Sequence, residues 1–481
     1  MLFKMYIGGK WYDGKGERRD VINPATGSVL GQLAMGDAGD VDDAVAAAKC
    51  AQKILADMSV FERAKMLYRI SDAIYARQNE LAQLLTAEQG KPLAEAMGEI
   101  SGSANVFREC ADQIKWMDSA IIPARETNRL CMVFMKPVGV FGIITPWNFP
   151  VGTPCMYYLA PGLAAGCPMI WNPATSTAAI ASLLMKCFEE AEVPAGFLSL
   201  VIGKGSVVGD SLSIHPDIAG IGFTGSTETG NIICGRARAK HTLMELGGNG
   251  PCIVLRDADL SLAADKLMAG SFTNAGQICT STERVLVDEA VADELAQLML
   301  ARMGRFVLGD PLDPKTTVGP MHAADTIAIV HEHIAEAVRK GAKVLTGGKR
   351  QENRPTPNYI EPTIIDHVSS DSLLNKEETF GPVLPLIRFN NEDEIPALIK
   401  CSPYRLFGAI FSRDIDKAIT MAQQYNFGCV NINDGSHFWD TMLPAGGGGG
   451  GASGHGRSGG KYSINDFSEP RAINVNLQTR L

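Results

Sequence analysis

The feature that most constrains the fold is a stretch from residue 137 to residue 185 that contains no Asp, Glu, Lys or Arg. A transmembrane helix would need about 20 consecutive apolar residues. Seven prolines, the first at position 137 and the last at 173, interrupt the stretch too often for that. Buried parallel strands with a buried helix between them fit better, because such strands read as continuous apolar runs.

Strand and helix patterns alternate through this stretch and again further along the chain. The first series has strands at Val138–Thr145, Pro168–Trp171, Gly196–Ile202 and Ile218–Phe223, and a helix near Ala178–Ala191. The second has strands at Arg284–Val287 and Ala342–Leu345, and helices at Asp288–Met303 and Ala323–Lys340. This alternation predicts an α/β fold with two doubly wound lobes. We expect the active site in the cleft between the lobes.

Helices are predicted before the charge-free stretch. Residues 40–57 read as an amphipathic helix entered at Asp40. Ser59 and Glu62 form a capping-box pattern that opens a second helix. A third helix is predicted at about residues 92–118.

Composition excludes several classes of function. The net charge is −9, without a basic stripe, which argues against a nucleic-acid partner. Eleven cysteines without a CxxC pair argue against a disulfide framework or zinc knuckle, and no signal peptide is recognisable. We therefore expect a reducing, cytoplasmic compartment and no membrane partner. His331 and His333 diverge on a helix, so we predict a solvated helical face and no metal.

Five short motifs carry the chemistry. They are Thr145–Pro150 (TPWNFP), Phe223–Thr227 (FTGST), Glu245–Gly248 (ELGG), Gly276–Cys279 (GQIC) and Glu378–Pro382 (ETFGP). In this order and spacing they resemble the aldehyde dehydrogenase superfamily, over essentially the whole chain. The resemblance implies NAD(P)-dependent, non-acylating oxidation of a small-molecule aldehyde to a carboxylic acid.

The catalytic residue types suit that reaction. A thiolate is a good nucleophile for a carbonyl, and Cys279 matches the family nucleophile, although most free cysteines are structural. Asn148 matches the side chain that stabilises the oxyanion, where a turn asparagine is the plain alternative. Glu245 matches the base that activates water against the thioester. Because members that transfer the acyl group to coenzyme A usually lack this Glu, the resemblance favours hydrolysis.

A cofactor site is implied around the end of the Phe223 strand. Gly225 allows close backbone approach, and a following helix N-terminus suits a pyrophosphate near Ser226. The resemblance places Glu378 near the nicotinamide ribose and Phe380 beside the ring. It adds three further cofactor-binding positions, Ile144, Trp147 and Asn172.

Three departures from the family pattern concern cofactor and substrate. The motif that normally reads Lys-Pro-x-Glu is Asn172-Pro-Ala-Thr175, so both charges at the adenosine ribose are missing; NAD is expected, and NADP is possible. The usual Lys after Pro150 is replaced by Tyr157 and Tyr158, with one residue inserted. A loop that normally anchors the aldehyde pocket carries six glycines at 446–451, and we expect it to be mobile.

The substrate pocket is predicted from residues 432–440. Family members that act on small oxygenated or anionic aldehydes often carry arginines where this chain has His437, Phe438 and Trp439. Aromatic rings suit an aromatic or medium aliphatic aldehyde, whereas Arg suits a carboxylate. The alternative is a semialdehyde such as succinate semialdehyde, with Arg108 and Arg284 as candidate partners of its carboxylate.

The resemblance also implies a domain plan. Residues 1–121 and 141–246 form a Rossmann-like cofactor domain, 247–445 a catalytic domain, and 122–140 with 461–481 a small β oligomerisation arm. We expect a homodimer or homotetramer, because paired arms leave exposed sheet edges in a monomer. A second class of function also remains open, a family-shaped binding or structural protein with little catalysis.

Overall fold

The computed structural model describes residues 1–14 and 16–478. Its first lobe is built on an eight-stranded sheet in the order β20-β12-β11-β8-β9-β10-β2-β3. The inner pairs β12-β11, β11-β8, β8-β9 and β9-β10 are parallel, and the edges are antiparallel. The bounds are β2 Met5–Ile7, β3 Lys10–Tyr12, β8 Phe141–Thr145, β9 Met169–Pro173, β10 Leu198–Leu200, β11 Gly220–Thr224, β12 His241–Glu245 and β20 Gly454–His455.

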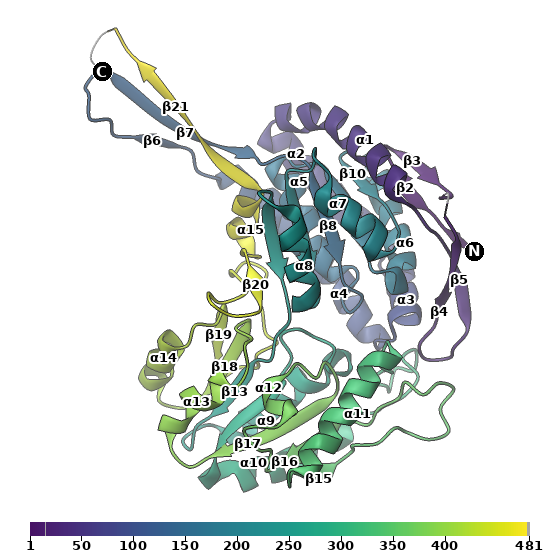
Figure 1. Ribbon diagram of the computed structural model, residues 1–481, viewed down its shortest axis with the longest axis vertical. Coiled ribbons are helices and arrows are strands. Elements are labelled where there is room, and N and C mark those ends of the chain that lie inside the picture. Colours follow the sequence, from purple (N-terminus) through teal and green to yellow (C-terminus); the bar gives the residue numbers. More distant parts are fainter. Residues whose placement is uncertain (15, 479–481) are drawn as a thin grey trace.

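Helices cover both faces of this sheet (Figure 1). They are α1 Ala38–Asp57, α2 Val60–Ala76, α3 Gln78–Gln89, α4 Leu93–Gln113, α5 Ala160–Ala165, α6 Ala178–Glu190, α7 Asp210–Ile214 and α8 Thr227–Ala237. The predicted capping box at Ser59 and Glu62 is present. α1 begins earlier than expected, because Asp37 caps it and Asp40 returns the hydrogen bond as its capping-box partner. A small sheet of β1 (Leu2–Phe3), β5 (Val29–Ala34) and β4 (Arg18–Ile22) lies beside the lobe.

The second lobe has a seven-stranded sheet in the order β15-β16-β17-β14-β13-β18-β19, parallel except for β15. The strands are β13 Pro251–Val254, β14 Arg284–Asp288, β15 Lys343–Thr346, β16 Thr363–Asp366, β17 Val383–Phe389, β18 Phe407–Phe411 and β19 Cys429–Ile432. The helices are α9 Leu260–Phe272, α10 Glu289–Arg302, α11 Ala324–Arg339, α12 Leu373–Lys376, α13 Ile395–Lys400 and α14 Ile415–Gln424. Each lobe has its own apolar core. The predicted α/β class with two lobes is confirmed.

A three-stranded arm projects from the first lobe (Figure 1). It consists of β6 (Ala120–Ile122), β7 (Arg129–Pro137) and β21 (Ser468–Asn476), in the order β21-β7-β6. The tail enters this arm later than the expected position 461. Residues Gly460–Asp466 instead form helix α15, which packs on α4 and α5 through the buried Ile464.

A π-helical turn lies where the sequence predicts one inserted residue after Pro150. Pro154–Leu159 forms this turn immediately before α5. A π-helix accommodates one extra residue without changing the register on either side. Within the described residues, no helix is long and apolar enough to cross a bilayer.

Candidate active site

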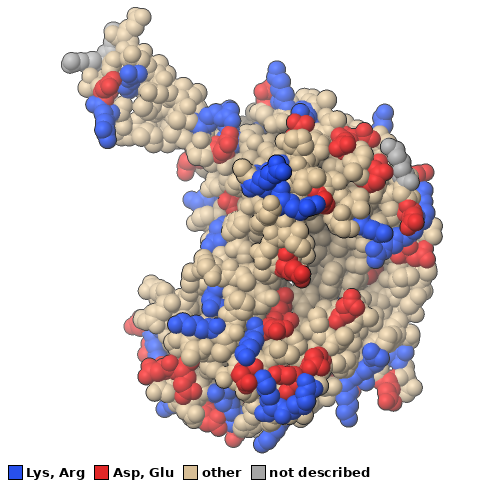
Figure 2. Space-filling model, in the orientation of Figure 1, with Lys and Arg blue, Asp and Glu red and all other residues tan. Residues whose placement is uncertain are grey.

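One cavity of about 450 Å³ lies between the two lobes and is lined by residues from both. Figure 2 shows a hollow on this face, with acidic and basic side chains interspersed around it rather than a continuous basic band. Eight predicted site residues line the cavity: Trp147, Asn148, Gly225, Ser226, Cys279, Glu378, Phe380 and His437. Five others lie outside its lining: Ile144, Asn172, Phe223, Glu245 and Phe438.

Cys279 follows a tightly wound turn in the second lobe. Asn274 and Ala275 have φ values of 51° and 53°, and Gly276 continues in the same region at 74°. A Cβ on Gly276 would lie 2.1 Å from the carbonyl oxygen of Gly381, so only glycine fits there. Burial, followed by the charges of Glu378 and Glu245, raises the pKa of the Cys279 thiol to about 12. The thiol is therefore neutral at physiological pH.

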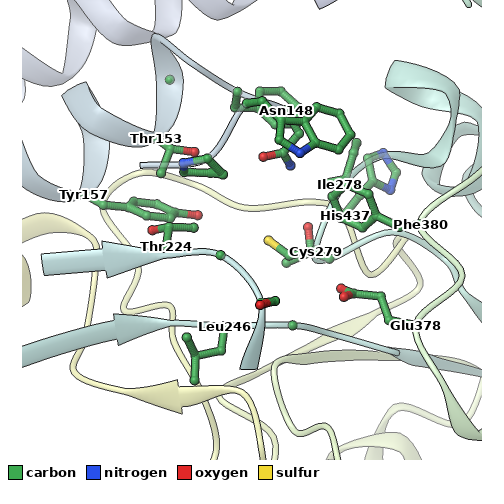
Figure 3. A pocket seen from close by; sticks show the side chains of 18 of the residues that line it. Asn148, Thr153, Tyr157, Thr224, Leu246, Ile278, Cys279, Glu378, Phe380 and His437 are labelled. Atoms are coloured by element: carbon green, nitrogen blue, oxygen red, sulfur yellow. The ribbon is translucent and has the colours of Figure 1, made fainter. Parts of the chain in front are cut away.

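Asn148 faces Cys279 across the cavity (Figure 3). Its Nδ2 donates one hydrogen bond to the carbonyl oxygen of Gln277, at 3.0 Å. Because a side-chain amide has two N–H donors, the second is available to a ligand beside Cys279. The two loops that carry Asn148 and Cys279 are thus held together directly.

Glu245 ends strand β12 and is buried behind the cavity lining, which includes its neighbours Leu246 and Gly247. Ser458 Oγ donates to Glu245 Oε1 at 3.3 Å. Burial raises the pKa of Glu245 to about 8, against the opposing effects of Ser458 and Arg457. The carboxyl group therefore changes its charge close to neutral pH, so that both its protonated and its ionised form are accessible.

The predicted nucleotide side of the cavity is built by β11 and α8. Ser226 caps α8 by accepting a hydrogen bond from the backbone N–H of Thr229, at 3.3 Å. A Cβ on Gly225 would lie 2.6 Å from the ring of Phe223, which is buried in β11. Helix N-termini with close backbone approach bind phosphate groups, so these residues fit a dinucleotide.

Glu378 and Phe380 enter the cavity from the other lobe. Glu378 Oε1 accepts from the backbone N–H of Gly248 at 2.8 Å, and burial raises its pKa to about 7. The ring of Trp147 meets that of Phe380 edge to face, with centroids 5.6 Å apart. On its other side Trp147 stacks on His322 at 4.7 Å.

The prediction of a solvated face for the histidine pair was wrong for His333. Its side chain is buried, and its Nδ1 lies 3.1 Å from Thr379 Oγ1. It thereby supports the turn that carries Glu378 and Phe380. Within residues 1–14 and 16–478, no cluster of His, Cys, Asp and Glu has the form of a metal site.

Asn172 and Ile144 lie at the carboxyl ends of β9 and β8. Asn172 is buried, and its Nδ2 donates to the carbonyl oxygens of Val201 and Gly203 at 3.0 and 3.2 Å. Its amide donors are therefore used within the protein. A positively charged side chain from strand β4 reaches the same edge of the sheet. Arg19 Nη1 donates to Thr175 Oγ1 at 2.7 Å.

Aromatic side chains form the part of the cavity opposite Glu378. Tyr157, from the π-helical turn, meets Trp439 edge to face at 5.3 Å, and both line the cavity. Phe438 was predicted here wrongly. It is 47% exposed and lies outside the lining, because adjacent residues of the loop point in different directions. Of the described residues that line the cavity, none is Lys or Arg.

The two arginines considered as carboxylate partners lie elsewhere. Arg284 is fully buried in the second lobe and donates to backbone carbonyls, including that of Asn249 at 3.0 Å. Arg108 is on α4, where it pairs with Asp72. Neither lines the cavity.

Several residues around the site were not anticipated. Ser458 contacts Glu245 but is separated from it by more than 200 residues, and Lys91 contacts the Asn148 loop from a position two residues before α4. Glu99 also lines the cavity. None of these three belongs to the five motifs of the sequence.

Comparisons with known proteins identify the family. The model of the aldehyde dehydrogenase family matches residues 11–473. An NADP-dependent succinate-semialdehyde dehydrogenase of Escherichia coli is 37% identical, over 98% of this chain and 97% of its own. A 3-sulfolactaldehyde dehydrogenase of Pseudomonas putida is also 37% identical, over 97% and 96%.

Solved structures give the same result. An aldehyde dehydrogenase of Brucella melitensis biovar abortus superposes with a TM-score of 0.96 at 36% identity, over 99% of this chain and 98% of its own. A betaine aldehyde dehydrogenase of Staphylococcus aureus in complex with NAD⁺ gives 0.94 at 31%, over 100% and 95%. The chain belongs to the aldehyde dehydrogenase family. It is an NAD(P)-dependent oxidoreductase that acts on aldehydes.

Proposed function

We propose that the chain oxidises an uncharged aldehyde to a carboxylic acid through the thiol of Cys279. The observation that carries this proposal is the single cavity shared by Cys279, Asn148 and the capped N-terminus of α8. A nucleophile, an oxyanion donor and a phosphate-binding helix end meet there.

The first step is the attack of Cys279 Sγ on the carbonyl carbon, in which the C–S bond forms and the thiol proton passes to water. The resulting oxyanion accepts hydrogen bonds from the free N–H of Asn148 Nδ2 and from the backbone N–H of Cys279. Such preorganised donors in a site shielded from water are often the largest contribution to catalysis. They also offset the high pKa of the Cys279 thiol, because they stabilise the charge that its attack creates.

Residues on the nucleotide side fit an NAD(P) cofactor. When bound, NAD(P)⁺ accepts the hydride that leaves the carbonyl carbon. The N-terminus of α8, with Gly225 and Ser226, suits the pyrophosphate, and the Glu378 carboxylate suits ribose hydroxyls. Arg19 beside Thr175 supplies a cation of the kind that accommodates a 2′-phosphate, which supports use of NADP as well as NAD.

Hydrolysis of the thioester on Cys279 completes the reaction. Glu245 accepts a proton from the attacking water, which adds to the acyl carbon, and the Cys279 sulfur leaves. Ser458 orients the carboxylate through its hydrogen bond at 3.3 Å. Burial keeps the pKa of Glu245 at about 8, close to the range in which a general base is effective.

The cavity wall favours an uncharged substrate. Tyr157, Trp439 and Phe407 offer apolar surface, and Glu99 and Glu378 are the only residues lining the cavity, among those described, that carry a carboxyl group. A carboxylate on the substrate would therefore lack an arginine or lysine partner in the cavity lining. Aromatic or medium aliphatic aldehydes fit this wall best.

A semialdehyde is the second candidate, and the relatives support it. The E. coli and P. putida proteins named above act on succinate semialdehyde and 3-sulfolactaldehyde, according to their names, and both of these substrates are anionic. Comparing kcat/KM for benzaldehyde and succinate semialdehyde separates the two candidates.

The proposed reaction is tested by NAD(P)H absorbance with a panel of aldehydes. We expect wild type to produce NAD(P)H and Cys279→Ala to lose at least about 1,000-fold in kcat/KM. Cys50→Ala, an exposed thiol remote from the cavity lining, serves as the control and retains activity. Inactivity of wild type across the panel would favour a binding role instead.

We also propose the domain roles and an oligomer. Residues 1–121 and 141–246 would hold the cofactor, and 247–445 the nucleophile. The strands β6 and β21 form the edges of the arm and expose Ile121 (73%) and Ile473 (48%). Such an edge is stabilised by a second copy of the chain. Light scattering should therefore give a dimer or tetramer, and a monomer would contradict this.

A further inference from the structure

Three charged residues spaced by four lie beside the catalytic loops. They are Lys91, two residues before α4, and Glu95 and Glu99 in the first turns of α4; Lys91 and Glu99 are buried, and Glu95 is half-buried. The Lys91 side chain is 0% exposed and that of Glu99 is 2%, and their Nζ and Oε2 atoms are 2.5 Å apart. Removing two charges from water is expensive, and apolar replacements of a buried pair are often equally stable. The stability of α4 therefore does not explain this pair.

Each member of the pair binds the backbone of the Asn148 loop. Lys91 Nζ donates to the carbonyl oxygen of Asn148 at 2.9 Å and lies 3.8 Å from the centre of the Phe149 ring. Glu99 Oε1 accepts from the backbone N–H groups of Val151 and Gly152 at 2.9 and 2.8 Å. The loop is thus fixed at Asn148 itself and again three and four residues later.

The second catalytic loop is attached to the same row. Glu95 Oε2 accepts from the backbone N–H of Asn274 at 2.9 Å. Asn274 Nδ2 in turn donates to the same Asn148 carbonyl oxygen, at 3.1 Å. Both loops around the oxyanion position are therefore held by the same short segment, the start of α4 and the residue Lys91 just before it.

We propose that the Lys91–Glu99 ion pair is a positioning device that sets the Asn148 amide for the oxyanion. This inference rests on the proposed function, because it assumes that Asn148 stabilises an oxyanion on the Cys279 adduct. Hydrogen bonds to charged groups are shorter and stronger than neutral ones, so they restrict the loop more tightly. A catalytic amide displaced by about 1 Å loses about 100-fold in rate.

The first test uses Lys91→Met and Glu99→Gln. We expect each to lower kcat by about 10- to 100-fold with a small change in KM, because the oxyanion forms only after substrate binds. Glu88→Gln is the matched control. Glu88 is equally buried and also accepts two backbone N–H groups, from Ala179 and Ile180, but these belong to α6. Its kcat should remain within twofold of wild type.

Two further variants distinguish the positioning role of the ion pair from a purely structural role. Lys91→Met combined with Glu99→Leu removes both charges and leaves an apolar pair, so we expect near-wild-type melting with the low kcat retained. Lys91→Met in an Asn148→Ala background should cost little additional rate, because the amide it positions is gone. If Lys91→Met lowers kcat by the same factor with and without the Asn148 side chain, the proposal is overturned. Recovery of kcat in the apolar double variant would also overturn it.

Cleavage of p-nitrophenyl acetate distinguishes this inference from the proposed function. The reaction acylates Cys279 with release of p-nitrophenolate and needs no NAD(P). If wild type oxidises no aldehyde in the panel, the proposed function fails, whereas the dependence of ester cleavage on Lys91 and Asn148 still tests positioning. Equal rates of ester cleavage in wild type, Lys91→Met and Glu99→Gln would overturn it.

Discussion

Ser458 donates a hydrogen bond to Glu245 at 3.3 Å, directly beside the backbone of Gly446. Two segments about 200 residues apart in sequence thereby share one buried carboxyl group. Because burial raises the pKa of Glu245 to about 8, its charge state changes just above neutral pH. The contact therefore links loop structure to the pH dependence of the reaction.

The first prediction concerns pH. Only the ionised form of Glu245 accepts a proton from water, so kcat should rise with pH through about 8 when hydrolysis limits the rate. Ser458→Ala removes a hydrogen bond to the charged form, which raises the pKa and moves this rise to higher pH. Steady-state profiles from pH 6 to 10 measure both. A rise that persists unchanged in Glu245→Gln would assign it to another group.

The second prediction concerns substrate charge. Trp439→Arg places a cation in the wall opposite Glu378, so kcat/KM for succinate semialdehyde should rise relative to benzaldehyde by about 10-fold, the effect of roughly 1.4 kcal/mol. Phe438→Arg adds the same charge one residue earlier, outside the cavity lining, and should leave the ratio unchanged. An equal shift in both variants would mean that overall charge, rather than the wall, is responsible.

The third prediction concerns the cofactor. Arg19→Ala removes the cation beside Thr175, so the dissociation constant of NADP⁺ should increase by about 10-fold while that of NAD⁺ changes little. Quenching of intrinsic fluorescence measures both constants without turnover. The neighbouring Arg18, which donates to the carbonyl of Asp13, provides the control variant Arg18→Ala. Parallel loss of both cofactors would indicate a general effect on folding.

The fourth prediction concerns the six-glycine segment. A Cβ on Gly448 would lie 2.0 Å from the carbonyl oxygen of Asn426, whereas one on Gly449 meets nothing closer than 3.6 Å. Gly448→Ala should therefore destabilise the protein by about 1–3 kcal/mol and lower its melting temperature. Gly449→Ala should behave like wild type. Equal melting temperatures for the two variants would show that the segment rearranges freely.

Much of the fold was predictable because its helices and strands depend on patterns of residues close in sequence. The capping box at Ser59 and the strands within the charge-free stretch follow from residues close in sequence. The strand at Val138 begins later, at Phe141, because the backbone of Val138 pairs with Phe467 of the tail. That partner is more than 300 residues away, and no local pattern indicates it.

In the candidate site too, local motifs reveal some residues, whereas others depend on contacts between distant parts of the chain. Motifs identified Cys279, Asn148 and Glu378, and all three line one cavity. Which of the neighbours Phe438 and Trp439 faces inward depends on the path of the loop, and sequence spacing alone does not determine it. Lys91 was overlooked for a related reason, since its role depends on a carbonyl 57 residues further along the chain.

The π-helical turn at Pro154–Leu159 has a consequence for how enzymes of this kind diversify. It confines an added residue to a single turn, so the polypeptide on both sides keeps its alignment with the rest of the lobe. A change of length here can alter which side chain, such as Tyr157, faces the cavity without rebuilding the scaffold. Single-residue insertion or deletion in this turn is accordingly a compact route by which selection, or a protein engineer, could retune the choice of aldehyde.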